Sequence, residues 1–184
     1  MSAHEWSQSR SGAIELADTD DIVFYPALVD LAPGESRTIR VGTTVTAQEV
    51  ERTYRMFIEE LPGEAPASSG VRVLTRVGVP VFVAPEHAVT SARFTDARLD
   101  HGKLTVTLQN AGTTHFQARA IHVVGSRGKE QLFAHEESAW YVLAKGARDF
   151  TITVPDAACL SDVFRITLSA AEAEAVMELP GGCH

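Results

Sequence analysis

Residues 70–85 read GVRVLTRVGVPVFVAP, and valine occupies every second position through most of this stretch. Because side chains on an extended chain point to opposite faces at every second residue, the pattern predicts a β-strand with one face of valine. Strands in globular proteins usually have about five or six residues, and this run is much longer. We therefore expect a strand whose apolar face is longer than its own domain needs.

The composition of the whole chain is that of a folded protein. Of the 184 residues, 45% are hydrophobic, and no apolar run is long enough to span a bilayer. The net charge of -8 argues against nucleic acid as a partner, because proteins that bind nucleic acid usually carry a basic surface. The first 30 residues lack the charged and then apolar pattern of a secretory signal peptide.

Short segments rich in β-branched and aromatic residues recur along the chain and are separated by Gly, Pro, Asn and Asp. Apart from one possible helical turn at 169–175, they predict strands. Strands this frequent are typical of an all-β sandwich. The clearest predicted strands cover residues 22–25, 37–41, 54–59, 103–109, 118–124, 149–154 and 163–168.

A weak internal repeat predicts two similar domains, at 1–85 and 86–184. LAPGESRTIRV at 31–41 resembles LAKGARDFTITV at 143–154, and a similar strand follows each, YRMFIEE and FRITLSA. The second half has more residues ahead of its repeat than the first half, so we expect the first domain to lack about two N-terminal strands. Missing strands leave core side chains and strand edges uncovered, and we expect a strand-swapped homodimer to cover them.

The two cysteines, Cys159 and Cys183, flank a predicted hairpin centred near residue 171. Antiparallel pairing about that centre places them opposite each other, so a disulfide between them is geometrically plausible. Such a bond would indicate an oxidising compartment. Two free thiols in a reducing cytosol are the alternative.

The sequence shows no motif for catalysis or for a metal. His135 precedes two glutamates, but neighbouring residues on a strand point to opposite faces. The acidic run at 18–21 lacks the spacing of a calcium loop, and no nucleophile or phosphate-loop motif is present. We expect a protein that is not an enzyme and has no metal site and no cofactor.

An ordered set of motifs resembles the periplasmic pilus-assembly chaperones of the chaperone-usher systems, in the archaic branch associated with spore-coat-U-like pilins. The resemblance implies two immunoglobulin-like sandwiches, a periplasmic location, and pilus subunits and an outer-membrane usher as partners. The motifs, in order, are Trp6-Ser-Gln, Tyr25-Pro26, the 31–41 segment, ERTYRMFIEELP at 51–62, GVRV at 70–73, VPVFVAP at 79–85, Asn110-Ala-Gly and WYVLAKGAR at 140–148.

The same resemblance implies that this chain is N-terminally shortened, because members of the family begin with a signal peptide and two further strands. A mis-assigned start and a degenerate gene are both open as explanations. An alternative function from another class is a structural or adhesive sandwich protein, such as a pilus subunit that accepts strands.

Members of the family lend a strand to a pilus subunit that lacks its last strand. The donor positions that match here are Val71, Val73 and Thr75, with Val77 next on the same face. Thr75 departs from the large apolar residue expected, which implies a shallower contact at that position. Main-chain hydrogen bonds give such a complex its affinity, and alternate side chains set its register. An ordinary core strand with a long tail is the alternative.

The best-known members hold the terminal carboxylate of the subunit with two basic residues. Here Pro80 occupies one of those positions, and the other is absent. Arg52, Arg55 and Arg76 lie in predicted neighbouring strands and could replace them, because a guanidinium binds a carboxylate through two parallel hydrogen bonds. We prefer Arg55; for each arginine, a solvated strand face is the alternative.

Overall fold

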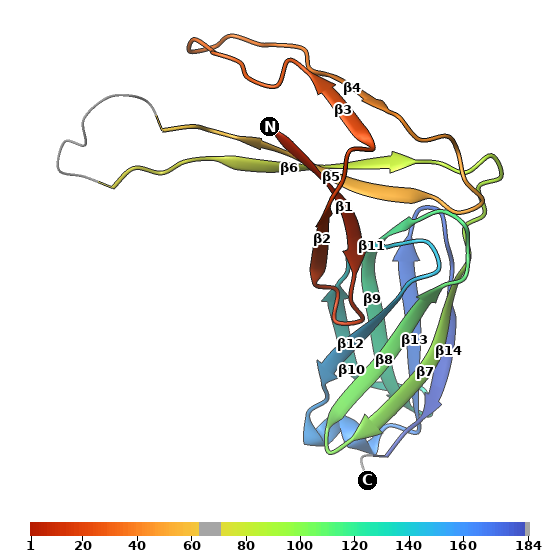
Figure 1. Cartoon of the computed structure of the whole chain (residues 1–184). Helices are drawn as coiled ribbons and strands as arrows, with labels where there is room; N and C mark the ends of the chain where they lie inside the picture. The colour runs from red at the N-terminus through yellow and green to blue at the C-terminus, as the bar shows by residue number, and fades with distance from the viewer. Residues whose placement is uncertain (63–70, 183–184) are drawn as a thin grey trace. The chain divides into compact units, whose positions relative to one another are not determined.

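A computed structural model describes residues 1–62 and 71–182, and its regular secondary structure is almost entirely β-strand (Figure 1). The chain divides into two compact units. Unit 1 comprises Met1–Ser7, Glu15–Ala47 and Arg52–Val83; unit 2 comprises Gln8–Ile14, Gln48–Glu51 and Ala84–His184. The all-β class with two sandwich-like parts is confirmed, while a domain boundary at residue 85 stays a prediction.

Unit 2 is a sandwich of two sheets. One has the order β12-β8-β7 and the other β10-β9-β13-β14, with β11 also pairing β9. The strands are β7 (Ala92–Asp100), β8 (Lys103–Asn110), β9 (Phe116–Arg127), β10 (Glu130–Ser138), β11 (Tyr141–Val142), β12 (Ala147–Thr153), β13 (Val163–Ala170) and β14 (Val176–Pro180).

The core of unit 2 is formed by side chains at every second position of its strands. Leu104, Val106 and Leu108 of β8 are fully buried, and so are Phe164 and Ile166 of β13 in the facing sheet. Alternating residues of both sheets therefore meet in one apolar core, as in other sandwiches.

The predicted hairpin about residue 171 is present, because β13 pairs β14 with Val163 opposite Pro180. The helical turn predicted at 169–175 is wrong, since the connection is a bend closed by the Leu168 N–H donating to the Ala175 carbonyl. Within the described residues the only helix is the 3-10 helix η1 (Asp156–Leu160), which contains Cys159. Cys183 lies outside the described residues, so the disulfide stays a prediction.

Unit 1 contains a counterpart of one of the two sheets of unit 2. β1 (Ser2–Gln8), β2 (Ile14–Asp18), β5 (Arg52–Glu59) and β6 (Arg76–Val83) form a sheet of order β2-β1-β5-β6. That order matches β10-β9-β13-β14, which supports the internal repeat. A separate pair joins β3 (Ile22–Tyr25) to β4 (Arg40–Thr43), and Trp6, Tyr54 and Met56 are buried in this unit.

The strand predicted at 37–41 is displaced, because β4 begins at Arg40. The physical reason lies in its partners. In unit 2, the matching segment β12 pairs β8 along its whole length. In the described part of unit 1, β4 pairs β3 alone, and no strand takes the places that β7 and β8 have in unit 2. Residues 37–39 therefore lack the ladder that would hold them extended.

No helix in the part of the chain that the structure describes has the length and the apolar character needed to cross a membrane.

Candidate functional site

β6 forms one edge of its sheet. It pairs β5 from Arg52 opposite Val83 to Glu59 opposite Arg76, and no described strand pairs its other edge. One further step of pairing joins Glu60 to Thr75, through the Glu60 N–H to the Thr75 carbonyl at 2.8 Å. A strand edge with unpaired backbone groups is a template for another chain.

The strand predicted over 70–85 is shorter in the structure, because β6 covers Arg76–Val83 only. The reason is that β5 ends at Glu59, so no described strand offers residues 71–74 a ladder. Residue 70 lies outside the described residues.

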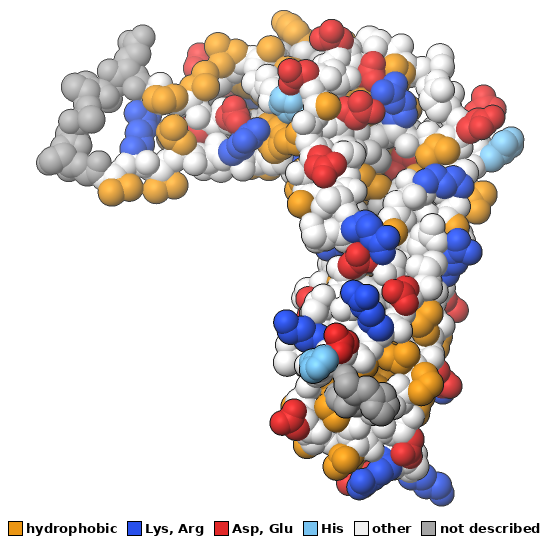
Figure 2. Space-filling view, turned by 60° about the horizontal axis from the view of Figure 1, so that its bottom comes forward, with side chains coloured by type: hydrophobic (Ala, Val, Ile, Leu, Met, Phe, Trp, Pro, Cys, Tyr) orange, Lys and Arg blue, Asp and Glu red, His pale blue; other side chains and the backbone are white. Residues whose placement is uncertain are grey.

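Three of the predicted donor side chains are exposed at or before the start of β6. Val77 is opposite Ile58 and half exposed, while Val73 is 81% exposed and Val71 is 96% exposed. Further along β6, Val79 and Val81 lie opposite Met56 and Tyr54, which are buried. The valine face of β6 is therefore next to the core of unit 1 at Val79 and Val81, and the valines that precede β6 in the chain are exposed. Apolar side chains are visible at the surface of the projecting β5–β6 strands in Figure 2.

The opposite face of β5 and β6 carries aromatic rings and arginines. The Arg76 guanidinium carbon lies 3.9 Å from the centroid of the Phe57 ring, and that of Arg55 lies 5.1 Å from the Trp6 ring. Gly78 lies beneath this layer, because a Cβ there would be 3.0 Å from Cε1 of Phe57. Cation–π contact thus orders the arginines of this face.

The structure does not bring the three candidate anchor arginines together. Arg52 lies on the valine face, where it forms ion pairs with Asp21 at 3.0 Å and Glu5 at 3.3 Å. Arg76 lies on the other face and pairs Glu59 at 2.7 Å. Arg55 shares that second face and is directly opposite Pro80.

A buried polar network supports the sheet and was missed by the sequence reading. The Tyr54 hydroxyl is buried and donates to Oδ2 of Asp21 at 2.8 Å, and Arg52 binds the same oxygen. Burial, with the bond to Asp21, raises the pKa of Tyr54 to about 12. The sequence shows an acidic run at 18–21, but only the fold shows that Asp21 accepts a hydrogen bond from a buried hydroxyl.

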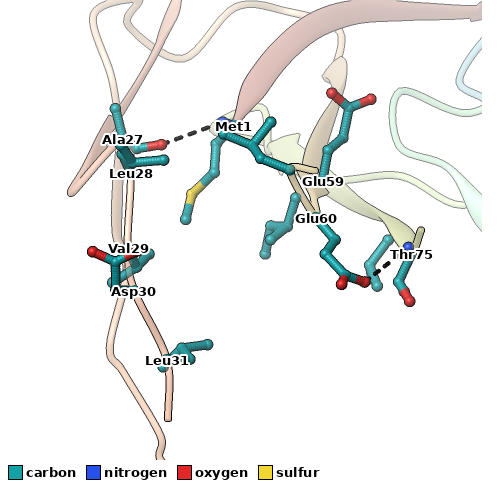
Figure 3. A pocket seen from close by; sticks show the side chains of 12 residues that line it. Met1, Ala27, Leu28, Val29, Asp30, Leu31, Glu59, Glu60 and Thr75 are labelled. Carbon is teal, nitrogen blue, oxygen red and sulfur yellow. Dashed lines mark hydrogen bonds between the residues drawn. The ribbon is translucent and has the colours of Figure 1, made fainter. Parts of the chain in front are cut away.

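A pocket of about 560 Å³ lies in unit 1 beside the donor segment. Figure 3 shows Ala27–Leu31 as one wall, with Glu59, Glu60 and Thr75 on the other and Met1 between them. Ile58, Leu61 and Val77 complete an apolar lining. The described residues contain no group of three or more His, Cys, Asp or Glu side chains placed to hold a metal.

Comparisons with known proteins agree with this geometry. Residues 3–88 match the family model of the pili and flagellar-assembly chaperone, PapD N-terminal domain. The structure is similar to that of the class 5 fimbriae chaperone CfaA, with a TM-score of 0.57 and 13% identity, covering 98% of this chain and 83% of that one.

A second similar structure is a chain from a chaperone–tip adhesin complex of CFA/I fimbriae biogenesis. Its TM-score is 0.55 at 12% identity, and the match covers 98% of this chain and 84% of that one. No curated protein matches the sequence. The family model and the fold together make this chain similar to the PapD-like pilus-assembly chaperones, a class that is periplasmic and not enzymatic.

Proposed function

We propose that this chaperone binds an unfinished pilus subunit by donating residues 71–77, and that it then delivers the subunit to an outer-membrane usher. The observation that carries the proposal is the exposure of Val73 and Val71, which continue the valine alternation of β6 in the sequence before its first residue. The free edge of β6 supplies main-chain donors and acceptors for a subunit strand.

The donor positions differ in depth. Val71 and Val73 are the most exposed and would enter the deepest pockets of a subunit groove, whereas Thr75 already pairs Glu60 through its backbone. Thr75 would therefore make a shallow contact. Val77, opposite Ile58, would mark the point where the donated strand ends and the chaperone's own core begins.

For the terminal carboxylate of the subunit, we propose Arg55 as the anchor. It lies directly opposite Pro80, the position at which related chaperones have a lysine, and the Trp6 ring orders its guanidinium. Arg52 and Arg76 are weaker candidates, because neither lies opposite Pro80. The motifs also favour the archaic, spore-coat-U-associated branch, which usher and pilin genes of that type beside this gene would support.

Co-expression with a subunit of the same pilus system tests the donor strand. In Val73→Asp, a carboxylate would enter an apolar groove, so we expect the subunit to be lost from the purified complex. Arg72→Ser, on the opposite face of the same segment, is the matched control and should retain the subunit. Undiminished copurification with Val73→Asp would refute the donor assignment.

Arg55 has its own test. Arg55→Met keeps the apolar stem and removes the charge, and we expect weaker binding of a subunit with a free terminal carboxylate. A subunit that is amidated at its C-terminus should bind both proteins equally. An equal loss for both subunits would show that Arg55 only supports the fold.

A further inference from the structure

The backbone groups of β6 point alternately toward β5 and toward the free edge, which no described strand pairs. In an antiparallel pair, residues that exchange both main-chain hydrogen bonds alternate with residues whose N–H and C=O groups point away from the partner strand. Thr75 bonds toward β5, because the Glu60 N–H donates to its carbonyl at 2.8 Å. The Thr75 N–H donates to the Glu60 carboxylate at 3.2 Å, a bond drawn in Figure 3. Both backbone groups of Thr75 therefore point to β5.

The register of the ladder extends this assignment along β6. From residue 76 to residue 83, each residue of β6 stands opposite one residue of β5. Every second residue after Thr75 is a valine of β6, so the backbone groups of these valines bond to β5. Arg76, Gly78 and Pro80 lie between the valines, and their backbone groups therefore point to the free edge.

Pro80 occupies the kind of position in β6 that a proline can take. Its nitrogen carries no hydrogen and cannot donate to a ladder. Because Pro80 stands opposite Arg55 in a pair that exchanges no main-chain bond, the ladder between β5 and β6 loses no bond. Pro80 is also partly exposed. A strand on the free edge thus finds N–H donors at Arg76 and Gly78 and only a carbonyl at Pro80.

Alternation of the donor valines does not by itself determine where a subunit strand stops along this edge. A slip of one residue turns every side chain to the opposite face. A slip of two residues keeps each valine on the groove side and moves it to the neighbouring pocket. A subunit strand that slipped past Gly78 would place a main-chain carbonyl against Pro80, where no N–H meets it. Such an unpaired acceptor loses its hydrogen bond to water without replacement, which weakens binding.

We propose that Pro80 sets the register of the bound subunit, because it ends the intermolecular ladder on the free edge of β6 after Gly78. The subunit strand pairs the main chain at Arg76 and Gly78 and stops before Pro80, so Val71 and Val73 enter fixed pockets. This role rests on the proposed function, since it needs a subunit bound to the donor segment. It differs from the proposed role of Arg55, because it depends on a missing N–H and on no charge.

Pro80→Ala restores the missing N–H and makes it a probe. In protein labelled with isotopic alanine, the variant has one additional amide resonance, which belongs to position 80. We expect this amide to exchange rapidly with deuterium in the free variant and slowly when a co-expressed subunit of the same pilus system is bound. The subunit should also dissociate about two- to tenfold more slowly than from the wild type, because one main-chain hydrogen bond is gained.

Pro155→Ala is the matched control. Pro155 is exposed and precedes η1 in unit 2, far along the chain from β6. Its new amide should exchange equally with and without the subunit, and the subunit should dissociate at the wild-type rate. Circular dichroism and urea unfolding check that both variants keep the wild-type fold.

Two results would overturn the proposal. One is a slowly exchanging amide at position 80 in the free variant, because a segment of the chain itself would then cover this edge. The other is an amide at position 80 that still exchanges rapidly in the complex while residues 71–77 are protected; the donor assignment would then stand without the role of Pro80. If residues 71–77 exchange equally with and without the subunit, the proposed function fails, and this role fails with it.

Discussion

Tyr54 is the most informative position for testing the structure of unit 1. In Tyr54→Phe the ring remains in the core, but the bond from the hydroxyl to Asp21 at 2.8 Å is lost. A hydrogen bond to a charged group contributes about 1.5–3 kcal/mol, and Asp21 keeps its ion pair with Arg52. We expect the variant to be less stable than the wild type by about 2 kcal/mol at pH 7.

The pKa of Tyr54 makes this difference depend on pH. The pKa is about 12 in the folded protein and about 10 in the unfolded chain. Because the folded pKa is the higher one, the stabilisation is complete below pH 10 and is lost as the pH rises through 12. By linkage the wild type loses about 1 kcal/mol of this advantage at pH 11 and about 2 kcal/mol at pH 12. The two proteins should then be about equally stable.

Urea unfolding followed by tryptophan fluorescence measures this directly. Trp140→Phe leaves Trp6, which is buried in unit 1, as the one remaining tryptophan. Tyr25→Phe is the matched control, because Tyr25 is 71% exposed and should show no effect at any pH. A difference between wild type and Tyr54→Phe that stays constant from pH 7 to 12 would refute the buried bond.

Two further predictions concern stability. Gly78→Val would crowd the Phe57 ring, so we expect the free energy of unfolding of unit 1, measured in urea, to fall by about 1–3 kcal/mol. Gly42→Ala is the control, because a Cβ there makes only an ordinary van der Waals contact and should change the stability little. Equal losses of stability in the two variants would contradict this packing. In unit 2 the hydrogen bond from Arg10 lowers the pKa of Asp149, so this stabilisation is present above about pH 4 and is lost as the pH falls through the lower folded pKa. Arg10→Gln should therefore be less stable than wild type at pH 7, and the difference in stability should shrink as the pH falls below about 4. A difference that does not shrink in acid would exclude the ion pair.

The class of fold could be predicted from the sequence, because apolar residues at every second position directly indicate β-strands. The strand at 22–25 was predicted with its observed bounds, and the hairpin joining β13 to β14 was recognised from spacing. The strand at 37–41 and the full length of the 70–85 strand were not predictable, because a strand needs a partner and alternation alone does not show where the partner ends.

The site was harder to predict for a related reason. The donor valines can be predicted from the alternation of apolar residues in the sequence. The face of the sheet on which an arginine lies depends on the register of the strand pairing, which the sequence does not determine. Arg52 and Arg55 are three residues apart in the same strand and lie on opposite faces. The bond from Tyr54 to Asp21 joins residues 33 positions apart, and no local pattern signals it.

Hydrogen–deuterium exchange of the chaperone with and without a bound subunit tests the donor strand most directly. No described strand pairs residues 71–74, so their amides should exchange rapidly in the free protein. When the subunit is bound, we predict strong protection of 71–77 and little change in unit 2. Protection elsewhere, with 71–74 still exchanging rapidly, would contradict the account.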